Sequence, residues 1–196
     1  MTTESKIQAS PRSEKGRRPK VIMVGAGFGG LTCAGALGRS PVDIVVIDRR
    51  NHHLFQPLLY QVATAALSPA DIADLIRKSL SRHKNISVVL GEVVSVDPEA
   101  KTLMTDDGHS HAYDYLILAT GSEYNYFGHD DWKEFAPGLK SLLDSRQIRQ
   151  RFLMAFEKAE LATSPEEKRA CLTTVVSGGG PTGVEMAVRS RNWVVS

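Results

Sequence analysis

A short apolar run that leads directly into closely spaced glycines constrains this chain more than any other feature. Residues 21–30 read Val-Ile-Met-Val-Gly-Ala-Gly-Phe-Gly-Gly, a predicted strand followed by the pattern Gly-x-Gly-x-x-Gly. A second apolar run over 42–47 ends in Asp48, close to the spacing of about 20 residues at which an acidic residue follows the glycines of a dinucleotide site. The sequence therefore predicts parallel strands that hold a dinucleotide.

Each glycine of this motif has its own physical role. Gly25 permits a tight turn, Gly27 leaves room for a pyrophosphate, and Gly30 lets the following helix pack closely on the strand. We expect that helix near 31–37, with its N–H groups and positive dipole end directed at the phosphates. Asp48 would then accept hydrogen bonds from a ribose. The alternative is a purely structural glycine turn.

The glycine pattern recurs late in the sequence. Residues 175–183 read Val-Val-Ser-Gly-Gly-Gly-Pro-Thr-Gly, which predicts a second strand and turn. A complete dinucleotide-binding half needs a helix, another strand and an acidic residue about 20 residues further on, and only a short segment follows Gly183. We therefore expect the second site to be incomplete.

Composition limits the class of protein. With 196 residues, 42% hydrophobic and 23% charged, the chain can bury one core and form one domain or slightly more. No apolar run approaches the ~18 residues of a transmembrane helix, and the N-terminus lacks a signal-peptide core, so we expect a cytoplasmic protein. Residues 1–19 are basic and nearly without apolar residues, which predicts a disordered leader, with attraction to anionic phospholipid as the alternative.

Two other kinds of site are not expected. Cys33 and Cys171 lack Cys-x-x-Cys spacing, which argues against a redox disulfide and favours small core residues. The histidine pairs at 52–53 and 109–111 have no supporting carboxylate or cysteine at ligand spacing, so no metal is predicted. Nucleic acid is not an expected partner either, because aromatic residues are not interleaved with basic ones.

The chain between the glycine motifs divides into predicted elements. Residues 68–71, Ser-Pro-Ala-Asp, form a helix start, and apolar residues at spacings of three and four continue this helix to Leu80. A strand at 86–90 and an antiparallel meander over 92–105 follow, with turns at Pro-Glu and Asp-Asp-Gly. The meander is expected to be an insertion in the parallel sheet.

Three further elements complete the prediction. The strand over 113–120 is too apolar to be exposed on either face, and it ends in Ala-Thr-Gly, where ligands of open α/β sheets bind. A simple strand-terminating turn explains that ending equally well. A long amphipathic helix over 142–161 carries both charge signs on its polar face, which favours a connecting element over a membrane anchor. Residues 164–167 open a short helix.

Four stretches of the sequence carry a resemblance to a known family. They are residues 21–30, 47–64, 119–122 and 178–185. Together they resemble the N-terminal part of a type II NADH dehydrogenase, a member of the FAD-dependent pyridine nucleotide oxidoreductases. The most specific stretch is 51–64, Asn-His-His-Leu-Phe-Gln-Pro-Leu-Leu-Tyr-Gln-Val-Ala-Thr, because flavoproteins in general share the glycine motifs but not this sequence. The resemblance extends from about residue 19 to residue 187, and its abrupt end before residues 188–196 implies a shifted reading frame or a cut gene.

This resemblance implies a non-proton-pumping NADH:quinone oxidoreductase, with FAD as cofactor and NADH as co-substrate. A hydride would pass from NADH to FAD, and two electrons would pass to a membrane quinone. The residues implied for FAD are Gly25, Ala26, Gly27, Phe28, Gly29, Gly30, Asp48, Arg49, Gln56, Val93, Thr120 and Gly121. Those implied for NADH are Gly178, Gly180 and Gly183, with Glu185 as the catalytic position where nicotinamide meets flavin.

We therefore expect an α/β fold. A Rossmann-like FAD-binding domain with an inserted antiparallel meander would cover 20–125, a connecting helical segment 126–171, and the truncated start of an NAD(H)-binding domain 172–196. The family associates peripherally with the inner face of the cytoplasmic membrane, through an anchor absent from this sequence. Alternatives are an FAD-binding module without turnover, a flavin reductase that serves ferredoxin or rubredoxin, and a non-functional remnant. The oligomeric state and the kind of quinone are not predicted.

Overall fold

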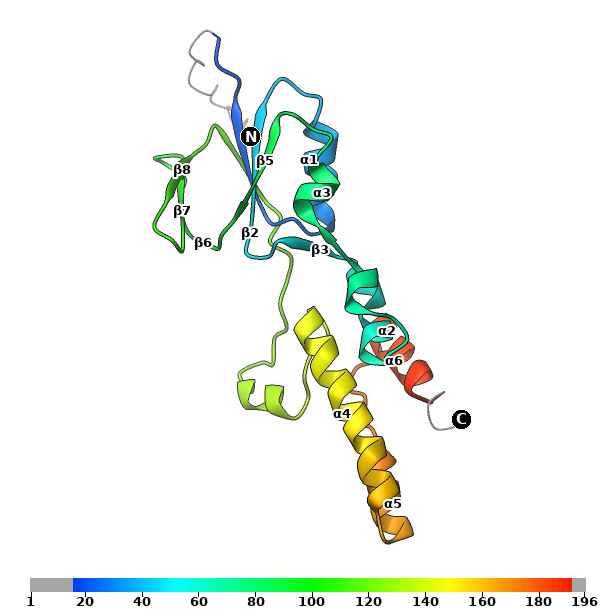
Figure 1. The fold of residues 1–196 in the computed structure, drawn as a ribbon. Helices are drawn as coiled ribbons and strands as arrows, with labels where there is room; N and C mark the ends of the chain where they lie inside the picture. The colour runs from blue at the N-terminus through cyan, green and yellow to red at the C-terminus, as the bar shows by residue number, and fades with distance from the viewer. Residues whose placement is uncertain (1–15, 192–196) are drawn as a thin grey trace, which may run out of the picture. The chain divides into compact units, whose positions relative to one another are not determined.

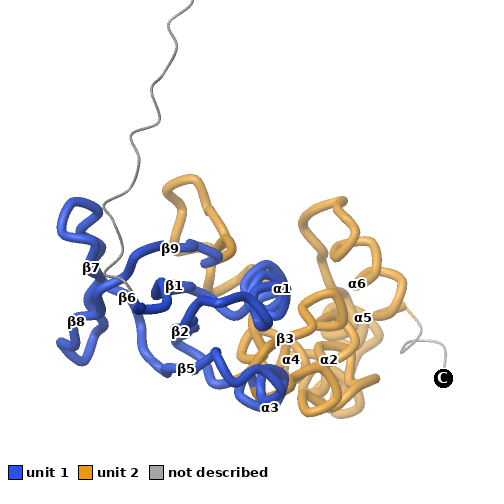
Figure 2. The backbone as a smooth tube through the Cα atoms, turned by 90° about the horizontal axis from the view of Figure 1, so that it is seen from above, with its two compact units in different colours: residues 1–51, 76–120 blue, residues 52–75, 121–196 orange. Residues whose placement is uncertain are grey.

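The computed structural model describes residues 16–191 as two compact units (Figure 2). The first unit contains the chain up to residue 51 and residues 76–120, and the second contains residues 52–75 and the chain from residue 121 onward. Most of the predicted basic leader and the last five residues lie outside the described residues. The first unit is therefore built from two separate pieces of the sequence.

A parallel sheet of four strands, in the order β5-β2-β1-β9, forms the centre of the first unit (Figure 1). The strands are β1 (Lys20–Val24), β2 (Asp43–Asp48), β5 (Ile86–Leu90) and β9 (Tyr115–Leu118). β1 pairs in parallel with both β2 and β9, and its residues Ile22 and Met23 are fully buried. A strand that is covered on both faces needs an apolar side chain at every position, which explains the run that precedes the glycines.

Different elements cover the two faces of this sheet. On one face, α1 (Phe28–Leu37) and α3 (Ile76–Leu80) bury Ala34, Ile76 and Leu80 against β1 and β2. On the other face lies an antiparallel meander of β6 (Val93–Asp97), β7 (Thr102–Thr105) and β8 (Ser110–Ala112). Its residue Leu103 packs on Ile22 and Ile47. The predicted α/β fold, a parallel Rossmann-like sheet with an inserted meander, is confirmed.

The single helix predicted from residue 68 to Leu80 is wrong. The structure divides this segment into a short 3₁₀ helix, η2 (Pro69–Asp71), a strand, β4 (Ala73–Leu75), and α3. The predicted cap at Ser68 is present, with its hydroxyl accepting a hydrogen bond from the N–H of Ala70. The helix nevertheless stops because β4 pairs antiparallel with β3 (His52–Leu54), so pairing with a distant segment overrides the local periodicity.

The expected burial of the last strand on both faces is also wrong. Tyr115 and Leu118 of β9 are 54% and 64% exposed. Among the described residues β9 pairs only with β1, so it is an edge strand of this sheet. Its apolar sequence alone does not show where in the sheet it lies.

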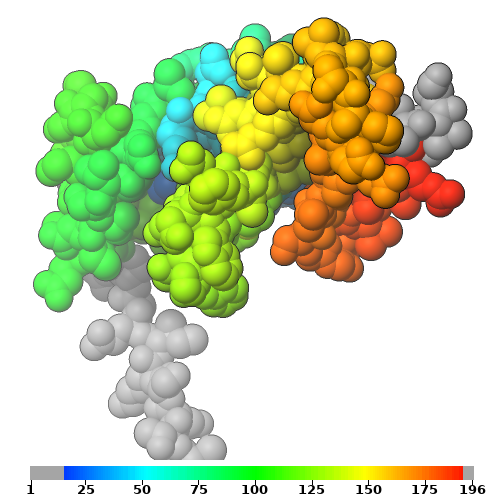
Figure 3. Space-filling model, turned by 90° about the horizontal axis from the view of Figure 1, so that it is seen from below, coloured from blue at the N-terminus to red at the C-terminus, as the bar shows by residue number. Residues whose placement is uncertain are grey.

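The second unit is mainly helical. Its elements are β3, η1 (Gln56–Leu58), α2 (Leu59–Ala63), η2, β4, η3 (Asp130–Glu134), α4 (Leu142–Leu161), α5 (Pro165–Leu172) and α6 (Pro181–Arg191). Leu59 and Val62 of α2 pack with Leu142 at the start of α4. The bounds of α4 are those predicted, and Ser141 caps it by accepting a hydrogen bond from the N–H of Asp144. Figure 3 shows the segment 121–140, in yellow-green, on the surface.

The strand predicted before the second glycine turn is not formed. Residues 173–179 have no regular structure, and Val175 is 87% exposed. A strand requires a hydrogen-bonded neighbour, and no strand among the described residues pairs with this segment. The helix that follows the glycines, α6, is formed nonetheless.

Candidate dinucleotide-binding site

The first glycine turn is fixed by backbone contacts on three sides. Gly25 has a φ of +100°, which favours glycine, and its N–H donates to the carbonyl oxygen of Ile47, 2.8 Å away. A Cβ added at Gly25 would overlap the main chain of Ala119, and one added at Gly30 would overlap the carbonyl oxygen of Gly25. Both positions therefore require glycine because backbone, which cannot move aside, occupies the space of a side chain.

The other two glycines face open space. A Cβ added at Gly27 or Gly29 would meet nothing within 4 Å. α1 begins at Phe28, and Gly27 provides no side chain to cap it. The first turn of a helix presents N–H groups and a positive dipole end, which together attract phosphate. The open cradle in front of α1 therefore fits the pyrophosphate of a dinucleotide.

Asp48 lies at the mouth of this turn. Its Oδ2 accepts a hydrogen bond of 2.6 Å from the N–H of Ala26, and its Oδ1 accepts one of 2.8 Å from the N–H of Arg50. Ala26 is only 1% exposed, so this acceptor satisfies a buried donor. Each carboxylate oxygen can accept more than one hydrogen bond, which leaves capacity for ribose hydroxyls. Asp48 thus combines a structural role with the position expected of a ribose ligand.

The ends of the neighbouring strands meet at the same edge. Gly91 follows β5 and donates its N–H to the carbonyl oxygen of Asp48 at 3.0 Å, which places the start of β6 at Val93 beside this edge. The side chain of Arg49 lies 3.6 Å from a carboxylate oxygen of Glu92. On the other side, the N–H of Ala119 donates to Val24 at 2.8 Å, which brings Thr120 beside the glycine turn.

The first unit therefore brings together most of the residues that the sequence singled out for FAD. They are Gly25, Ala26, Gly27, Phe28, Gly29, Gly30, Asp48, Arg49, Val93 and Thr120. Gln56 and Gly121 belong to the second unit, as do Gly178, Gly180, Gly183 and Glu185. The binding roles of all these residues remain predictions.

The second glycine turn has a similar local backbone. Gly178 has a φ of +111°, and a Cβ added at Gly183 would overlap the carbonyl oxygen of Gly178. The N–H of Val184 donates to the carbonyl oxygen of Gly180 at 3.0 Å as α6 begins. Glu185 follows in the first part of α6, where it is exposed.

Comparison with known proteins agrees with this geometry. The family described as pyridine nucleotide-disulphide oxidoreductase matches residues 19–194. The chain belongs to this family. Two type II NADH:quinone oxidoreductases of Mycobacterium tuberculosis are similar to this chain. Ndh is 46% identical to it over 183 residues, and NdhA is 49% identical over 184.

These two relatives are much longer than the present chain. The alignments cover 92% of its chain but only 40% of Ndh and 39% of NdhA, so it spans about two fifths of their length. The solved structure of NDH2 from Plasmodium falciparum in complex with NADH matches with a TM-score of 0.76 and 32% identity. That match covers 88% of this chain and 36% of the solved chain.

The sequence analysis missed one residue that anchors the start of β1 in this chain. Asp114, just before β9, accepts hydrogen bonds from the guanidinium of Arg17 at 2.9 Å and from the N–H of Lys20 at 2.6 Å. The hydrogen bond from Lys20, together with the charge of Arg17, lowers the pKa of the Asp114 carboxyl. Asp114 thereby fixes the start of β1, the strand that leads into the glycine turn. Because Asp114 and Arg17 are 97 residues apart, no local sequence pattern indicates that they pair.

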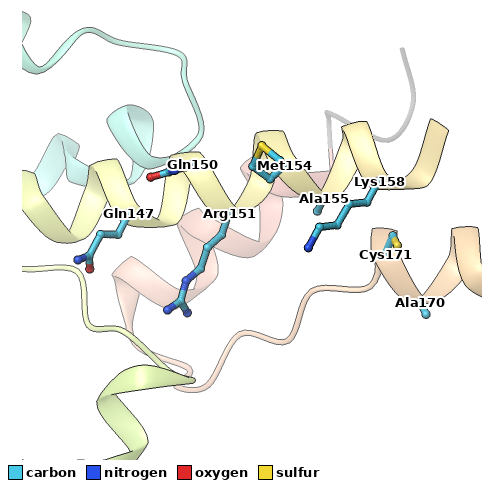
Figure 4. Close-up of a pocket in the computed structure, with 8 residues that line it drawn as sticks. All are labelled: Gln147, Gln150, Arg151, Met154, Ala155, Lys158, Ala170 and Cys171. Atoms are coloured by element: carbon cyan, nitrogen blue, oxygen red, sulfur yellow. The ribbon is translucent and has the colours of Figure 1, made fainter. Parts of the chain in front are cut away.

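This chain also has a groove of about 760 Å³ along α4 and α5 (Figure 4). Arg151 lines this groove, but its guanidinium donates to the main-chain oxygens of Glu134 and Phe135, at 2.7 and 3.4 Å. The groove contains none of the predicted site residues. Between residues 16 and 191 no cluster of three or more His, Cys, Asp or Glu residues could hold a metal ion.

Proposed function

We propose that this chain is the FAD-binding part of an NADH:quinone oxidoreductase. The observation that carries the proposal is the carboxylate of Asp48, hydrogen bonded to Ala26 at the mouth of a glycine turn that is open at Gly27 and Gly29. The names of the M. tuberculosis relatives support NADH as the donor and a quinone as the acceptor.

The residues of the first unit would share the work of holding the cofactor. Gly25 and Gly30 set the path of the chain, and the start of α1 would attract the pyrophosphate. Asp48 would accept hydrogen bonds from the ribose hydroxyls, and Val93 and Thr120 would line the dinucleotide. When bound, FAD supplies the two-electron chemistry that links NADH oxidation to quinone reduction. The protein's part is to position the reactants and exclude water, so it needs no catalytic triad or paired carboxylates.

The finer assignments belong to the same proposal. Gly178, Gly180 and Gly183 would turn the chain at the NADH pyrophosphate, with Glu185 near the nicotinamide, and Gln56 would lie near the flavin ring or the quinone. The quinone would be reached by peripheral association with the inner face of the cytoplasmic membrane. No helix within residues 16–191 is long and apolar enough to span a bilayer.

Cofactor retention by the purified 196-residue chain tests the proposal. We expect the wild-type chain to bind FAD, seen as flavin absorbance after gel filtration and as a measurable Kd. Asp48→Asn keeps an acceptor for Ala26 but loses the charge, and it should weaken binding about tenfold. Asp43→Asn, at the opposite end of β2, is the matched control and should bind like the wild type. A chain that stays colourless with excess FAD would refute the proposal.

Turnover is a separate measurement. Because no strand within residues 16–191 pairs with the segment before the second glycine turn, we expect NADH oxidation with a soluble quinone to fall well below the ~1–10³ s⁻¹ usual for enzymes. Turnover within that range would show that the 196 residues already form a complete NADH site. Binding of FAD without turnover identifies an FAD-binding module.

A further inference from the structure

The main chain of Glu92 is held on both sides by one residue. Its N–H donates to Oδ1 of Asp106 at 3.0 Å, and its carbonyl oxygen accepts from the N–H of Asp106 at 2.8 Å. Glu92 lies between Gly91, whose N–H donates to the carbonyl oxygen of Asp48, and Val93, the first residue of β6. Asp106 therefore fixes the segment 91–93 next to the candidate ribose ligand.

The pairing of β6 with β7 explains why a side chain does this work. The register shifts between Val93 and Ser95, and such a bulge removes regular main-chain partners. Val93 pairs with Thr105, the last residue of β7, so the carboxylate of Asp106 supplies an acceptor just beyond the end of the strand. Thr105 is 2% exposed, and its methyl group would lie 3.4 Å from a Cβ added at Gly91. The two segments are thus closely fitted.

The order of the strands indicates which part of a dinucleotide would meet this segment. A pyrophosphate at the turn after β1 and a ribose at Asp48 after β2 place the base beyond β2, towards β5. Asp48 is paired with Leu90, the last residue of β5, and segment 91–93 follows immediately. The base would therefore lie against the main chain that Asp106 holds.

We propose that Asp106 is a positioning residue for the adenine end of the cofactor, acting through the main chain of Glu92 and Val93. This inference rests on the proposed function. The ion pair of Arg49 with Glu92 crosses the same edge, but both side chains are more than half exposed at 3.6 Å, so it holds the segment only weakly. The positioning is carried by the two hydrogen bonds that Asp106 makes to the main chain of Glu92, one accepted by its carboxylate and one donated by its N–H.

The test compares ADP with IDP, which differ only in the base, as ligands of the full chain in calorimetry. Asp106→Ala should raise the Kd for ADP about fivefold and reduce the preference for ADP over IDP. Asp106→Asn keeps an oxygen acceptor and should restore both values. The control is Asp97→Ala, which removes an acceptor of the Glu99 and Ala100 N–H groups at the β6–β7 turn of the same meander. It should leave the Kd within twofold of the wild type.

Three results would overturn the inference. They are an unchanged Kd for ADP in Asp106→Ala, an equal loss of ADP and IDP affinity, and an equal effect of Asp97→Ala. Should Asp106→Ala not fold, Asp106→Glu decides, because the added methylene displaces the carboxylate and should also lower the ADP preference. If the wild-type chain binds neither FAD nor ADP, the proposed function fails and the inference fails with it. If the wild-type chain binds FAD normally and Asp106→Ala changes neither the Kd for ADP nor the preference for ADP over IDP, only the inference on Asp106 is refuted.

Discussion

The two glycine turns of this chain have nearly the same local backbone in different surroundings. Gly25 and Gly178 have φ values of +100° and +111°. At the last glycine of each turn, Gly30 and Gly183, a Cβ would overlap the carbonyl oxygen of the first. The spacing of the glycines and the helix that follows are therefore sufficient to set the path of the turn.

The segments before the two turns differ. β1 is paired on both sides, and the N–H of Gly25 donates to Ile47 of β2. Val175 and Val176, before the second turn, are 87% and 37% exposed and belong to no strand. A turn forms from local residues, whereas a strand and the binding edge beyond it need neighbours from elsewhere in the sequence. This difference is the reason to place a ligand at the first turn.

Alanine at the last glycine of each turn should separate the two regions most strongly. Gly30→Ala should lower the free energy of unfolding by about 3 kcal/mol, because the sheet prevents the carbonyl of Gly25 from moving away. Gly183→Ala should cost about 1 kcal/mol or less, because the unpaired segment can shift. Urea unfolding followed by circular dichroism measures both. Gly35→Ala, inside α1 with open space around its Cβ, is the control and should be neutral or stabilising. Equal losses at Gly30 and Gly183 would contradict the comparison.

The acceptor at the first turn gives the next largest effect. Asp48→Ala removes the carboxylate that accepts from the buried N–H of Ala26, and it should lower the free energy of unfolding by about 2 kcal/mol. Asp43→Ala, on the same strand, removes only a 3.9 Å ion pair to Arg18 between exposed side chains, and it should cost less than about 0.5 kcal/mol. Thermal unfolding of both variants provides the measurement. Similar melting temperatures would show that Asp48 does not stabilise the turn.

The anchor of β1 should give a smaller, pH-dependent effect. The pKa of Asp114 is lowered in the folded chain, so its charged form contributes stability that is fully present above the unfolded pKa of about 3.9. That contribution is lost as the pH falls through the lower folded pKa. Asp114→Asn should therefore cost about 1 kcal/mol near neutral pH and progressively less in acid. A loss of stability that is the same at neutral and acid pH would show that charge plays no part.

The smallest effect concerns the turn between β7 and β8 in the meander beside the first glycine turn. Hydrogen bonds from the Thr105 hydroxyl and from the N–H and ring of His109 lower the pKa of Asp107 to about 2. NMR titration of the carboxyl should find this value. Thr105→Val should raise the pKa more than His109→Ala does, because the hydroxyl makes the largest contribution. The reverse order would assign the shift to the imidazole.

Much of the first region was predictable because its signals are local. The turn at Gly25–Gly30, the acid at Asp48 and the strands of the meander follow from glycine spacing, apolar runs and turn residues. The bounds of α4 follow from a capping serine and helical periodicity. In each case neighbours in the sequence are also neighbours in the structure.

The errors arise where distant segments decide. β4 interrupts the predicted helix because it pairs with β3, and β9 is exposed because it lies at an edge. The hold of Asp106 on Glu92 depends on a bulge, and the anchor at Asp114 depends on a partner 97 residues away. Periodicity and propensity contain no information on these pairings, so this part of the site needed the structure.

Residues 52–75 belong to the second unit although they lie between two pieces of the first, and this affects how shorter fragments of the chain can be designed. Because the first unit resumes at residue 76, a single cut cannot release either unit intact. A fragment that ends near residue 125 would retain Leu59 and Val62 but lose Leu142, which packs against them. The apolar side chains of Leu59 and Val62 would then be exposed to water. Anyone who wants the glycine turn of the first unit on a shorter chain should replace 52–75 with a brief polar linker.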